Sequence, residues 1–156
     1  MKQPNQTIKE IFELRFGVEQ IFFRDFLQTY PTPEGVNHTH IQALMMLRFQ
    51  GPSPMSVISQ QLMLEKGSFT PVANKLIQLG LVAKLRSDLD KRVYHLSLTD
   101  EGESMAENFA ETHHTYIKTL LDRLSDEKRS EFMRSVNNAN TIMATLKDLP
   151  EKDCMK

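Results

Sequence analysis

Hydrophobic residues recur at helical spacing over residues 8–27 and cover more than one side of the expected helix. The apolar positions are Ile8, Ile11, Phe12, Leu14, Phe16, Val18, Ile21, Phe22, Phe23, Phe26 and Leu27. One neighbouring helix cannot bury so wide an apolar surface. We interpret it as a subunit interface, and a helix threaded through its own core is the alternative.

Shorter segments follow, separated by turn-forming residues. The stretch YPTPEGVNH predicts a break, after which Asn37 or Thr39 can cap a helix. The inward positions expected on that helix are Ile41, Leu44, Met45 and Phe49. GPSP at residues 51–54 ends it, and a short helix with Met55, Ile58 and Leu62 on one side comes next. EKGS then forms a tight turn, and Ser68 caps a further helix.

The helix that begins at Ser68 has two distinct faces. Its buried stripe is expected to hold Phe69, Val72, Ala73, Leu76 and Leu79. Its exposed face is expected to hold Ser68, Pro71, Asn74, Lys75 and Gln78. Pro71 is compatible with a helix because it lies in the first turn, where backbone N–H groups lack helical partners.

After Gly80 the pattern changes to alternation, which predicts strands over Val82–Arg86 and Val93–Leu98 joined by the polar turn SDLD. Thr99 is placed to cap a long helix, and SDEK at residues 125–128 to cap a last one. The inward positions of the long helix are Ala106, Phe109, Ala110, His113, Ile117, Leu120, Leu121 and Leu124. The last helix turns inward Phe132, Val136, Ala139, Met143 and Leu146. The order of four helices, a hairpin and two helices predicts a mainly α fold with a small β-hairpin.

Composition limits what the chain can be. With 156 residues, 40% hydrophobic and 25% charged, the sequence predicts one domain over residues 1–156. The whole chain has a net charge of -1, yet residues 51–98 carry a net charge of +3. A single cysteine, Cys154, excludes an internal disulfide and a cysteine-rich zinc site, which favours the cytoplasm. The first twenty residues contain no long apolar run, so neither a signal peptide nor a membrane partner is expected.

Helix, turn, helix and then a charged hairpin is the order of a winged helix-turn-helix, whose second helix enters the major groove of DNA. The hairpin would be the wing, and the bases Lys84, Arg86, Lys91 and Arg92 can reach phosphates or the minor groove. Asp88 and Asp90 are expected to brace the arginines by accepting hydrogen bonds. A charged hairpin tip is commonly only solvated. Here the position of the excess positive charge favours DNA binding.

The stretch LIQLGLVAKLRSDLDKRVYHLSLTDEG resembles the multiple antibiotic resistance regulator (MarR) family of bacterial transcription factors. The shared features are a Gly-Leu-Val step, a wing with Asp-x-Arg, and Leu-Thr-x-x-Gly. The resemblance implies a winged helix-turn-helix lobe over about residues 38–99 and a dimerisation lobe formed by residues 5–29 and 100–148. It also implies a homodimer on a pseudo-palindromic operator, acting as a repressor that a small aromatic or phenolic effector relieves.

Two positions depart from the family pattern. Pro71 stands where many members have a basic or polar residue that faces the bases, and Lys91 stands where the wing commonly has the first arginine of a pair. Proline cannot donate a hydrogen bond, so base reading is expected to shift to other side chains of the same helix. These are Ser68, Thr70, Asn74 and Lys75.

Other kinds of chemistry find less support. The histidines comparable with a metal site lack neighbouring acids, so no metal and no cofactor is expected. They are His38, His40, His113 and His114, and His113 is interpreted as a hydrogen-bonded core or interface residue. Cys154 is interpreted as an exposed thiol without a role. No glycine-rich phosphate loop or nucleophile elbow is present, so an enzyme is not expected.

Two other classes of function remain open from the sequence. One is a winged-helix protein interaction module that no longer binds DNA. The other is a protein that binds a small molecule or a metal and whose output is not transcription.

Overall fold

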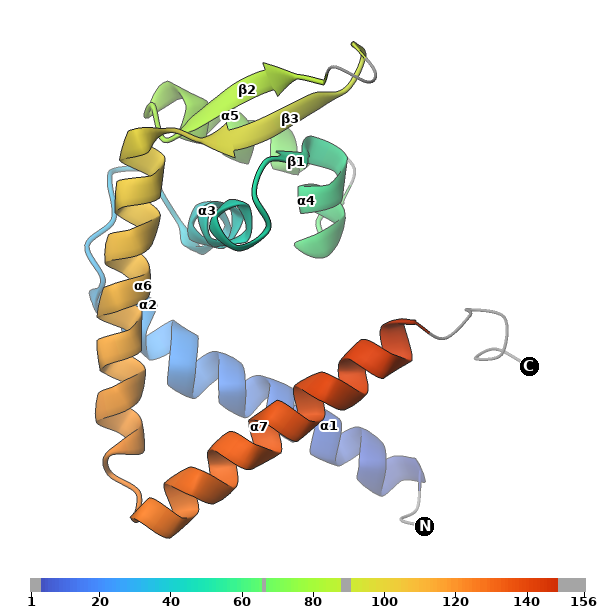
Figure 1. Cartoon of the computed structure of the whole chain (residues 1–156), viewed down its shortest axis with the longest axis vertical. Helices are drawn as coiled ribbons and strands as arrows, with labels where there is room; N and C mark the ends of the chain where they lie inside the picture. The colour runs from blue at the N-terminus through green and yellow to red at the C-terminus, as the bar shows by residue number, and fades with distance from the viewer. Residues whose placement is uncertain (1–3, 66, 88–90, 149–156) are drawn as a thin grey trace. The chain divides into compact units, whose positions relative to one another are not determined.

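The computed structural model of the protein describes residues 4–65, 67–87 and 91–148. Contacts along the chain divide it into one unit within residues 1–114 and a second within residues 115–156. The boundary falls inside α6 (Asp100–Leu121). Each unit is described by itself, and Figure 1 labels the elements of both.

The first helical segment runs from Pro4 to Thr29, close to the predicted limits. It consists of α1 (Pro4–Val18), the π-helical turn η1 (Glu19–Arg24) and α2 (Asp25–Thr29). The π turn was not predicted. Its wider hydrogen-bond spacing shifts the direction of the side chains that follow. Phe26 of α2, after the turn, is buried in the core at 4% exposure, whereas Ile11 of α1, before it, is 61% exposed in the single chain.

Three helices and a small sheet make up the winged helix. The helices are α3 (His38–Gln50), α4 (Met55–Gln61) and α5 (Phe69–Gln78), and the strands are β1 (Ser53–Pro54), β2 (Val82–Arg86) and β3 (Tyr94–Leu98). The antiparallel sheet has the order β1-β3-β2. The helix α3 packs on β3, α5 packs on β2, and α4 packs on β1 (Figure 1). The largest fully buried side chains are Leu44, Ile58, Leu76, Val82 and Leu96, so this arrangement encloses the core.

Two details of this part of the chain differ from the sequence prediction. The strand β1 was missed, because two residues that include Pro54 show no alternation and become a strand only by pairing with Leu96 and His95 of β3. Phe49 was predicted to face inward and is 75% exposed. The buried face of α3 is centred on His40, Leu44 and Leu47. At 3.6 residues per turn, Phe49 lies on the opposite side of the helix.

The predicted helix caps are mostly confirmed. Asn37 rather than Thr39 caps α3: its Oδ1 accepts from Thr39 N at 3.0 Å, and His40 Nδ1 accepts from Asn37 N at 3.1 Å. Thr99 and Ser125 cap α6 and α7 (Asp126–Lys147), as expected. Ser68 precedes α5, but its side chain makes no capping hydrogen bond, so its predicted role as a cap is wrong. Its backbone is already helical at φ -68° and ψ -21°, which is not the extended conformation of a side-chain cap.

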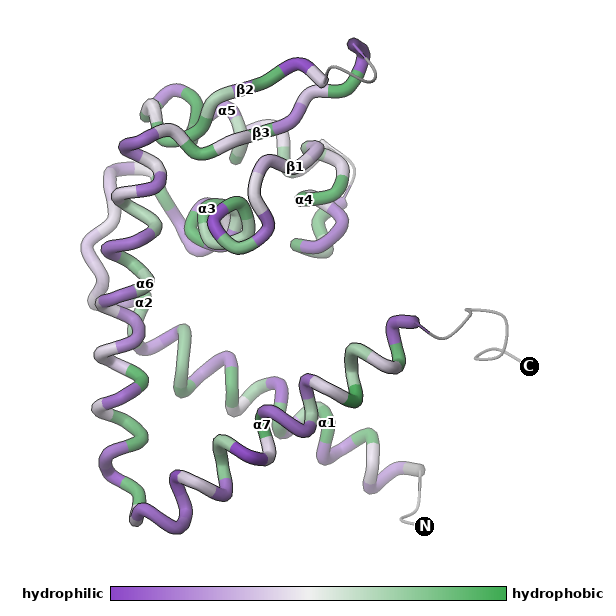
Figure 2. The backbone as a smooth tube through the Cα atoms, viewed as in Figure 1, coloured by the Kyte–Doolittle hydropathy of each residue, from purple (hydrophilic) through white to green (hydrophobic). Residues whose placement is uncertain are grey.

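The second unit consists of the end of α6 and the helix α7. Arg129 of α7 donates hydrogen bonds to Asp122, the residue that follows α6, at 2.6 Å, and to Asp126 at the start of α7. Several apolar side chains of α7 are at least half exposed in the single chain: Met133, Ile142, Met143 and Leu146. Figure 2 shows hydrophobic residues interspersed with polar ones along α1 and along α7. Within the described residues, no helix has both the length and the apolar character needed to span a membrane.

Candidate nucleic-acid interface

The exposed face of α5 presents most of the predicted base-reading residues. Phe69, Ala73 and Leu76 are buried, which fixes the rotation of the helix about its axis. Ser68, Thr70 and Asn74 consequently lie on the exposed side, together with Pro71 and Gln78. The Ser68 hydroxyl makes no capping hydrogen bond to the helix, so it does not stabilise the first turn. Three of the four predicted side chains thus share one polar surface.

Lys75 is placed differently from the other three. It is half-buried, and a Cβ atom at Gly35 would lie 2.9 Å from Lys75 Cε and 3.0 Å from Nζ. The lysine end therefore lies against the loop that precedes α3. Burial first, and the charge of Lys75 second, lower the pKa of the nearby His40. In this conformation Lys75 belongs to the contact between α5 and the start of α3.

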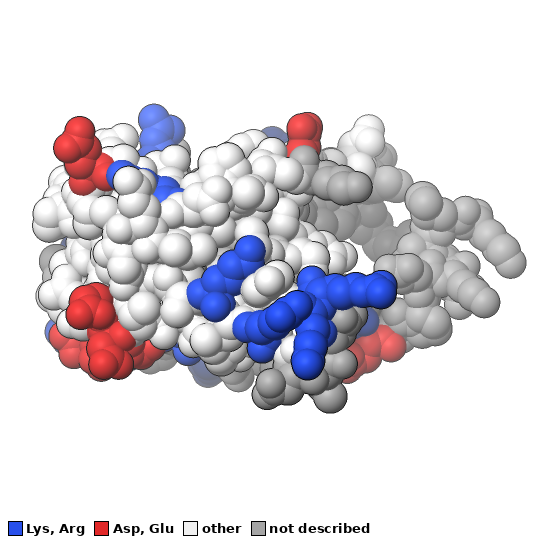
Figure 3. Space-filling view, turned by 90° about the horizontal axis from the view of Figure 1, so that it is seen from above, with Lys and Arg blue, Asp and Glu red and all other residues white. Residues whose placement is uncertain are grey.

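The hairpin of β2 and β3 presents the predicted basic residues to solvent. Lys84, Arg86, Lys91 and Arg92 are all exposed, and Lys and Arg side chains gather over this hairpin in Figure 3. Arg86 Nε donates a 2.8 Å hydrogen bond to the backbone carbonyl of Lys91. Ser87 N donates to Val93 O at 2.9 Å. Asp88 and Asp90, the residues predicted to brace the arginines, lie outside the described residues.

The sequence motif Leu-Thr-x-x-Gly has a structural explanation at the junction of the hairpin with α6. Thr99 Oγ1 accepts from Gly102 N at 3.0 Å and donates to Gly80 O at 2.5 Å. Thr99 N donates to Leu81 O at 3.1 Å. A Cβ atom at Gly102 would lie 1.8 Å from that same Leu81 oxygen. Glycine is therefore required for α6 to begin so close to the end of α5, and the wing is held at a fixed point of the core.

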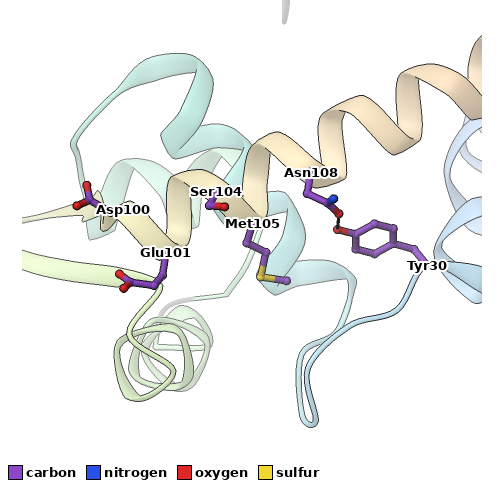
Figure 4. A pocket seen from close by; sticks show the side chains of 6 residues that line it. All are labelled: Tyr30, Asp100, Glu101, Ser104, Met105 and Asn108. Atoms are coloured by element: carbon purple, nitrogen blue, oxygen red, sulfur yellow. Dashed lines mark hydrogen bonds between the residues drawn. The ribbon is translucent and has the colours of Figure 1, made fainter.

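An open hollow of about 590 Å³ lies beside the start of α6 (Figure 4). Its lining residues are Tyr30, Asp100, Glu101, Ser104, Met105 and Asn108. The Tyr30 hydroxyl donates to Asn108 Oδ1 at 2.9 Å, and burial raises the pKa of Tyr30. Two carboxylates and no base line the hollow, so its chemistry disfavours an anionic ligand.

The four histidines have separate environments. His113 is buried, stacks on Phe26 with ring centroids 4.6 Å apart, and bonds through Nε2 to Phe22 O, as expected for a core histidine. His40 belongs to the cap of α3. His38 Nδ1 lies 3.9 Å from Glu19 Oε1, an acid that the local sequence did not indicate. Among the described residues, no three metal-ligating side chains come together. Cys154 lies outside those residues.

Comparison with known proteins gives the same picture. Residues 34–93, which include α3, α4, α5 and β2 and end just before β3, match the sequence model of the MarR family. The HTH-type transcriptional regulator MhqR of Bacillus subtilis is 28% identical over 104 residues, which cover 67% of this chain and 72% of that protein. The HTH-type transcriptional repressor MdtR of the same bacterium is 27% identical over 123 residues, which cover 79% of this chain and 77% of that one.

Solved structures agree on the fold. FabT of Streptococcus pneumoniae, in a crystal structure with DNA, superposes with a TM-score of 0.68 at 20% identity, covering 91% of this chain and 99% of that one. The fold and the family match together define a winged helix-turn-helix protein. The stretch that matches the MarR family model covers less than half of this chain, and the relatives MhqR and MdtR are named as a transcriptional regulator and a transcriptional repressor.

Proposed function

We propose that the protein is a sequence-specific DNA-binding transcriptional regulator. The observation that carries this proposal is that one winged helix presents both an exposed polar face on α5 and an exposed basic hairpin. Relatives that are named transcriptional regulators and repressors support it. The proposed compartment is the cytoplasm, where such a regulator meets DNA.

In this proposal, α5 enters the major groove and reads bases with Ser68, Thr70 and Asn74. The side-chain amide of Asn74 can form two hydrogen bonds with the edge of an adenine, which is the pairing that discriminates best for asparagine. Lys75 contacts a guanine or a phosphate after its side chain leaves the Gly35 loop. The wing residues Arg86, Lys91 and Arg92 neutralise phosphates or enter the minor groove.

The protein acts as a homodimer on a pseudo-palindromic operator, with one α5 helix per half-site. Support for the dimer comes from the apolar side chains that the single chain leaves in solvent. On α1 these include Ile8, Ile11 and Leu14, each more than half exposed, and on α7 they include Ile142 and Leu146. Faces this apolar are typical of an interface between subunits. Light scattering should give twice the 18.0 kDa of the chain, and a monomeric mass would contradict this part of the proposal.

The regulator is proposed to be a repressor that a small aromatic or phenolic effector releases from DNA. The hollow beside Tyr30 is one place to test, and its carboxylates Asp100 and Glu101 favour a neutral phenol over an aromatic acid. Phenol should therefore weaken DNA binding more than benzoate does at equal concentration. Equal or reversed effects would remove this hollow from the proposal.

A salt titration tests the main proposal. The full-length protein is titrated onto duplex DNA from upstream of its own gene at increasing salt. Binding should weaken steeply, and Arg92→Ala should lower the slope of log K against log salt by about one, since one phosphate contact is lost. If no DNA binds even at low salt, the proposal fails. The alternative of a protein interaction module without DNA binding would then be the better one.

A further inference from the structure

A small open cleft lies where the basic hairpin passes the start of α4. It has a volume of about 290 Å³. Its lining residues are Pro54, Met55, Ser56, Lys84, Arg92, Val93 and Tyr94. The lining contains two cations, a serine hydroxyl and a tyrosine, and none of its members is an acid. This volume is just below that of typical ligand pockets, which begin at about 300 Å³, so the cleft suits a small group, and its two cations suit an anionic one.

The register of the sheet explains how this cleft becomes basic. Lys84 pairs with Leu96 and Arg86 pairs with Tyr94, and residues that pair directly point to the same side of an antiparallel sheet. Leu96 is fully buried on that side, whereas Lys84 is exposed. The face of the sheet that covers the core therefore continues outward as a face of basic and aromatic side chains.

Lys84 is held in place on this face by an aromatic ring. Its Nζ lies 4.2 Å from the centroid of Tyr94, within the range of a cation–π contact, and the two residues are diagonal neighbours across the strands. In the part of the chain that the structure describes, no carboxylate pairs with Lys84. A ring restrains the ammonium without neutralising its charge. Tyr94 thereby prepares Lys84 for an anion from outside the chain.

We infer that this cleft binds one phosphodiester group of the DNA backbone, with Lys84 and Arg92 as charged donors and the Ser56 hydroxyl as a neutral donor. Tyr94 is a positioning residue that acts through Lys84. The inference rests on the proposed function and deepens it, because the contact fixes the hairpin and α4 to the same phosphate. Local sequence did not indicate Ser56 or Tyr94, since strand pairing brings them together.

The test compares variants of the full-length protein by salt titration on duplex DNA. Lys84→Gln should lower the salt slope by about one and weaken binding on the order of tenfold at 0.1 M salt. Lys9→Gln removes the same charge from α1, outside the winged helix, and should leave the slope unchanged. Ser56→Ala, on the other wall, should weaken binding without changing the slope, because serine is neutral. Thermal melts show which variants remain folded. If Lys84→Gln does not fold, the effect of Ser56→Ala on DNA binding still tests the inference.

The role of Tyr94 has its own pair of variants. Tyr94→Phe keeps the ring and should bind DNA like the wild type, whereas Tyr94→Leu should weaken binding several-fold. In the double variant with Lys84→Gln, the effect of Tyr94→Leu should disappear, because the ring then has no ammonium to position. Additive effects would overturn the positioning role.

DNA with single modified phosphates can identify the phosphate that the cleft binds. Replacing single phosphates by neutral methylphosphonates should reveal one position that weakens binding by the wild type clearly more than binding by Lys84→Gln, because only Arg92 and Ser56 still contact that phosphate in the variant. A titration with inorganic phosphate alone, followed by the amide resonances around Ser56, tests whether the cleft binds a free anion instead of DNA. Saturable binding at millimolar phosphate, with no sensitive phosphate position in the DNA, would overturn the inference. If the wild type binds DNA steeply while Lys84→Gln keeps its slope, the cleft inference fails and the proposed function stands. If the wild type binds no DNA, the proposed function fails.

Discussion

Arg86 Nε donates a 2.8 Å hydrogen bond to the backbone carbonyl of Lys91, across the hairpin. The bond uses one of the five donors of the guanidinium group and leaves its charge intact. Arg86 therefore has two tasks in the proposed wing: it closes the hairpin and supplies positive charge.

Replacing Arg86 separates these two tasks. Arg86→Lys keeps the charge but loses the planar donor group, so the hairpin should open more often. Hydrogen exchange at the Ser87 amide, which donates to Val93 O at 2.9 Å, should become several-fold faster, while the salt slope of DNA binding should not change. Lys91→Gln is the matched control: it should lower the slope by about one and leave the Ser87 exchange rate unchanged. Wild-type exchange in Arg86→Lys would refute the closing role.

Asn74 should decide sequence preference rather than overall affinity. Asn74→Ala removes the side-chain amide from the exposed face of α5, so discrimination against a changed adenine should fall by about 1 to 3 kcal/mol. Competition assays with point-substituted duplexes measure this quantity. Lys91→Gln should weaken binding to all of those duplexes nearly equally. An unchanged preference profile in Asn74→Ala would show that this residue reads no base.

Two glycines should respond in opposite ways to alanine. At Gly102 the new Cβ would lie 1.8 Å from Leu81 O and 2.8 Å from Leu81 C, so backbone must move and unfolding should become easier by about 3 kcal/mol or more. At Gly17, in α1, a Cβ meets no atom within 4 Å. Gly17→Ala should therefore stabilise the helix by about 0.5 to 1 kcal/mol. Urea unfolding of both variants gives the two values, and equal effects would contradict the close approach at Leu81.

The stability of the protein should depend on the protonation of His40. Burial first, and the charge of Lys75 second, lower the pKa of His40 from 6.5. The unfolded chain therefore binds a proton more readily than the folded chain. The His40 contribution is complete above pH 6.5 and is lost as the pH falls from 6.5 through the lowered folded pKa.

His40→Gln is the variant that tests this, since glutamine at the same position of a capping box can still bond back to the cap residue. Its free energy of unfolding should change less between pH 7 and pH 5 than that of the wild type. Lys75→Gln should reduce the wild-type dependence in part, because it removes the second cause. If all three proteins lose stability in parallel on acidification, His40 is not the group responsible.

Local features of the sequence were enough to predict many elements. The limits of β2, the cap at Asn37 and the exposure of Ser68, Thr70 and Asn74 all follow from spacing within a few residues. These features depend on helix and strand periodicity and on caps, which act over one or two turns. The histidine interpretation also held for His113, because its place on an apolar stripe already indicated burial.

Predictions failed where position depends on distant parts of the chain. Phe49 has the composition of a core residue and still faces solvent, because the buried side of α3 was set by its packing on β3 and α5. The strand β1 exists only through its pairing with β3. Lys75 looked like its exposed neighbours, and its end instead lies against Gly35, forty residues earlier in the chain.

The sequence by itself therefore determined the α-helices and the two strands of the hairpin, where the positive charge concentrates, and the resemblance to the MarR family. Only the tertiary structure decided which side chains meet. It placed Tyr94 beside Lys84 and brought Arg86 within hydrogen-bonding distance of the Lys91 carbonyl. It also made a glycine necessary at position 102 by bringing Leu81 O against α6. The physical reason is that strand register and helix packing join residues far apart in the chain, and local periodicity contains no information about those partners.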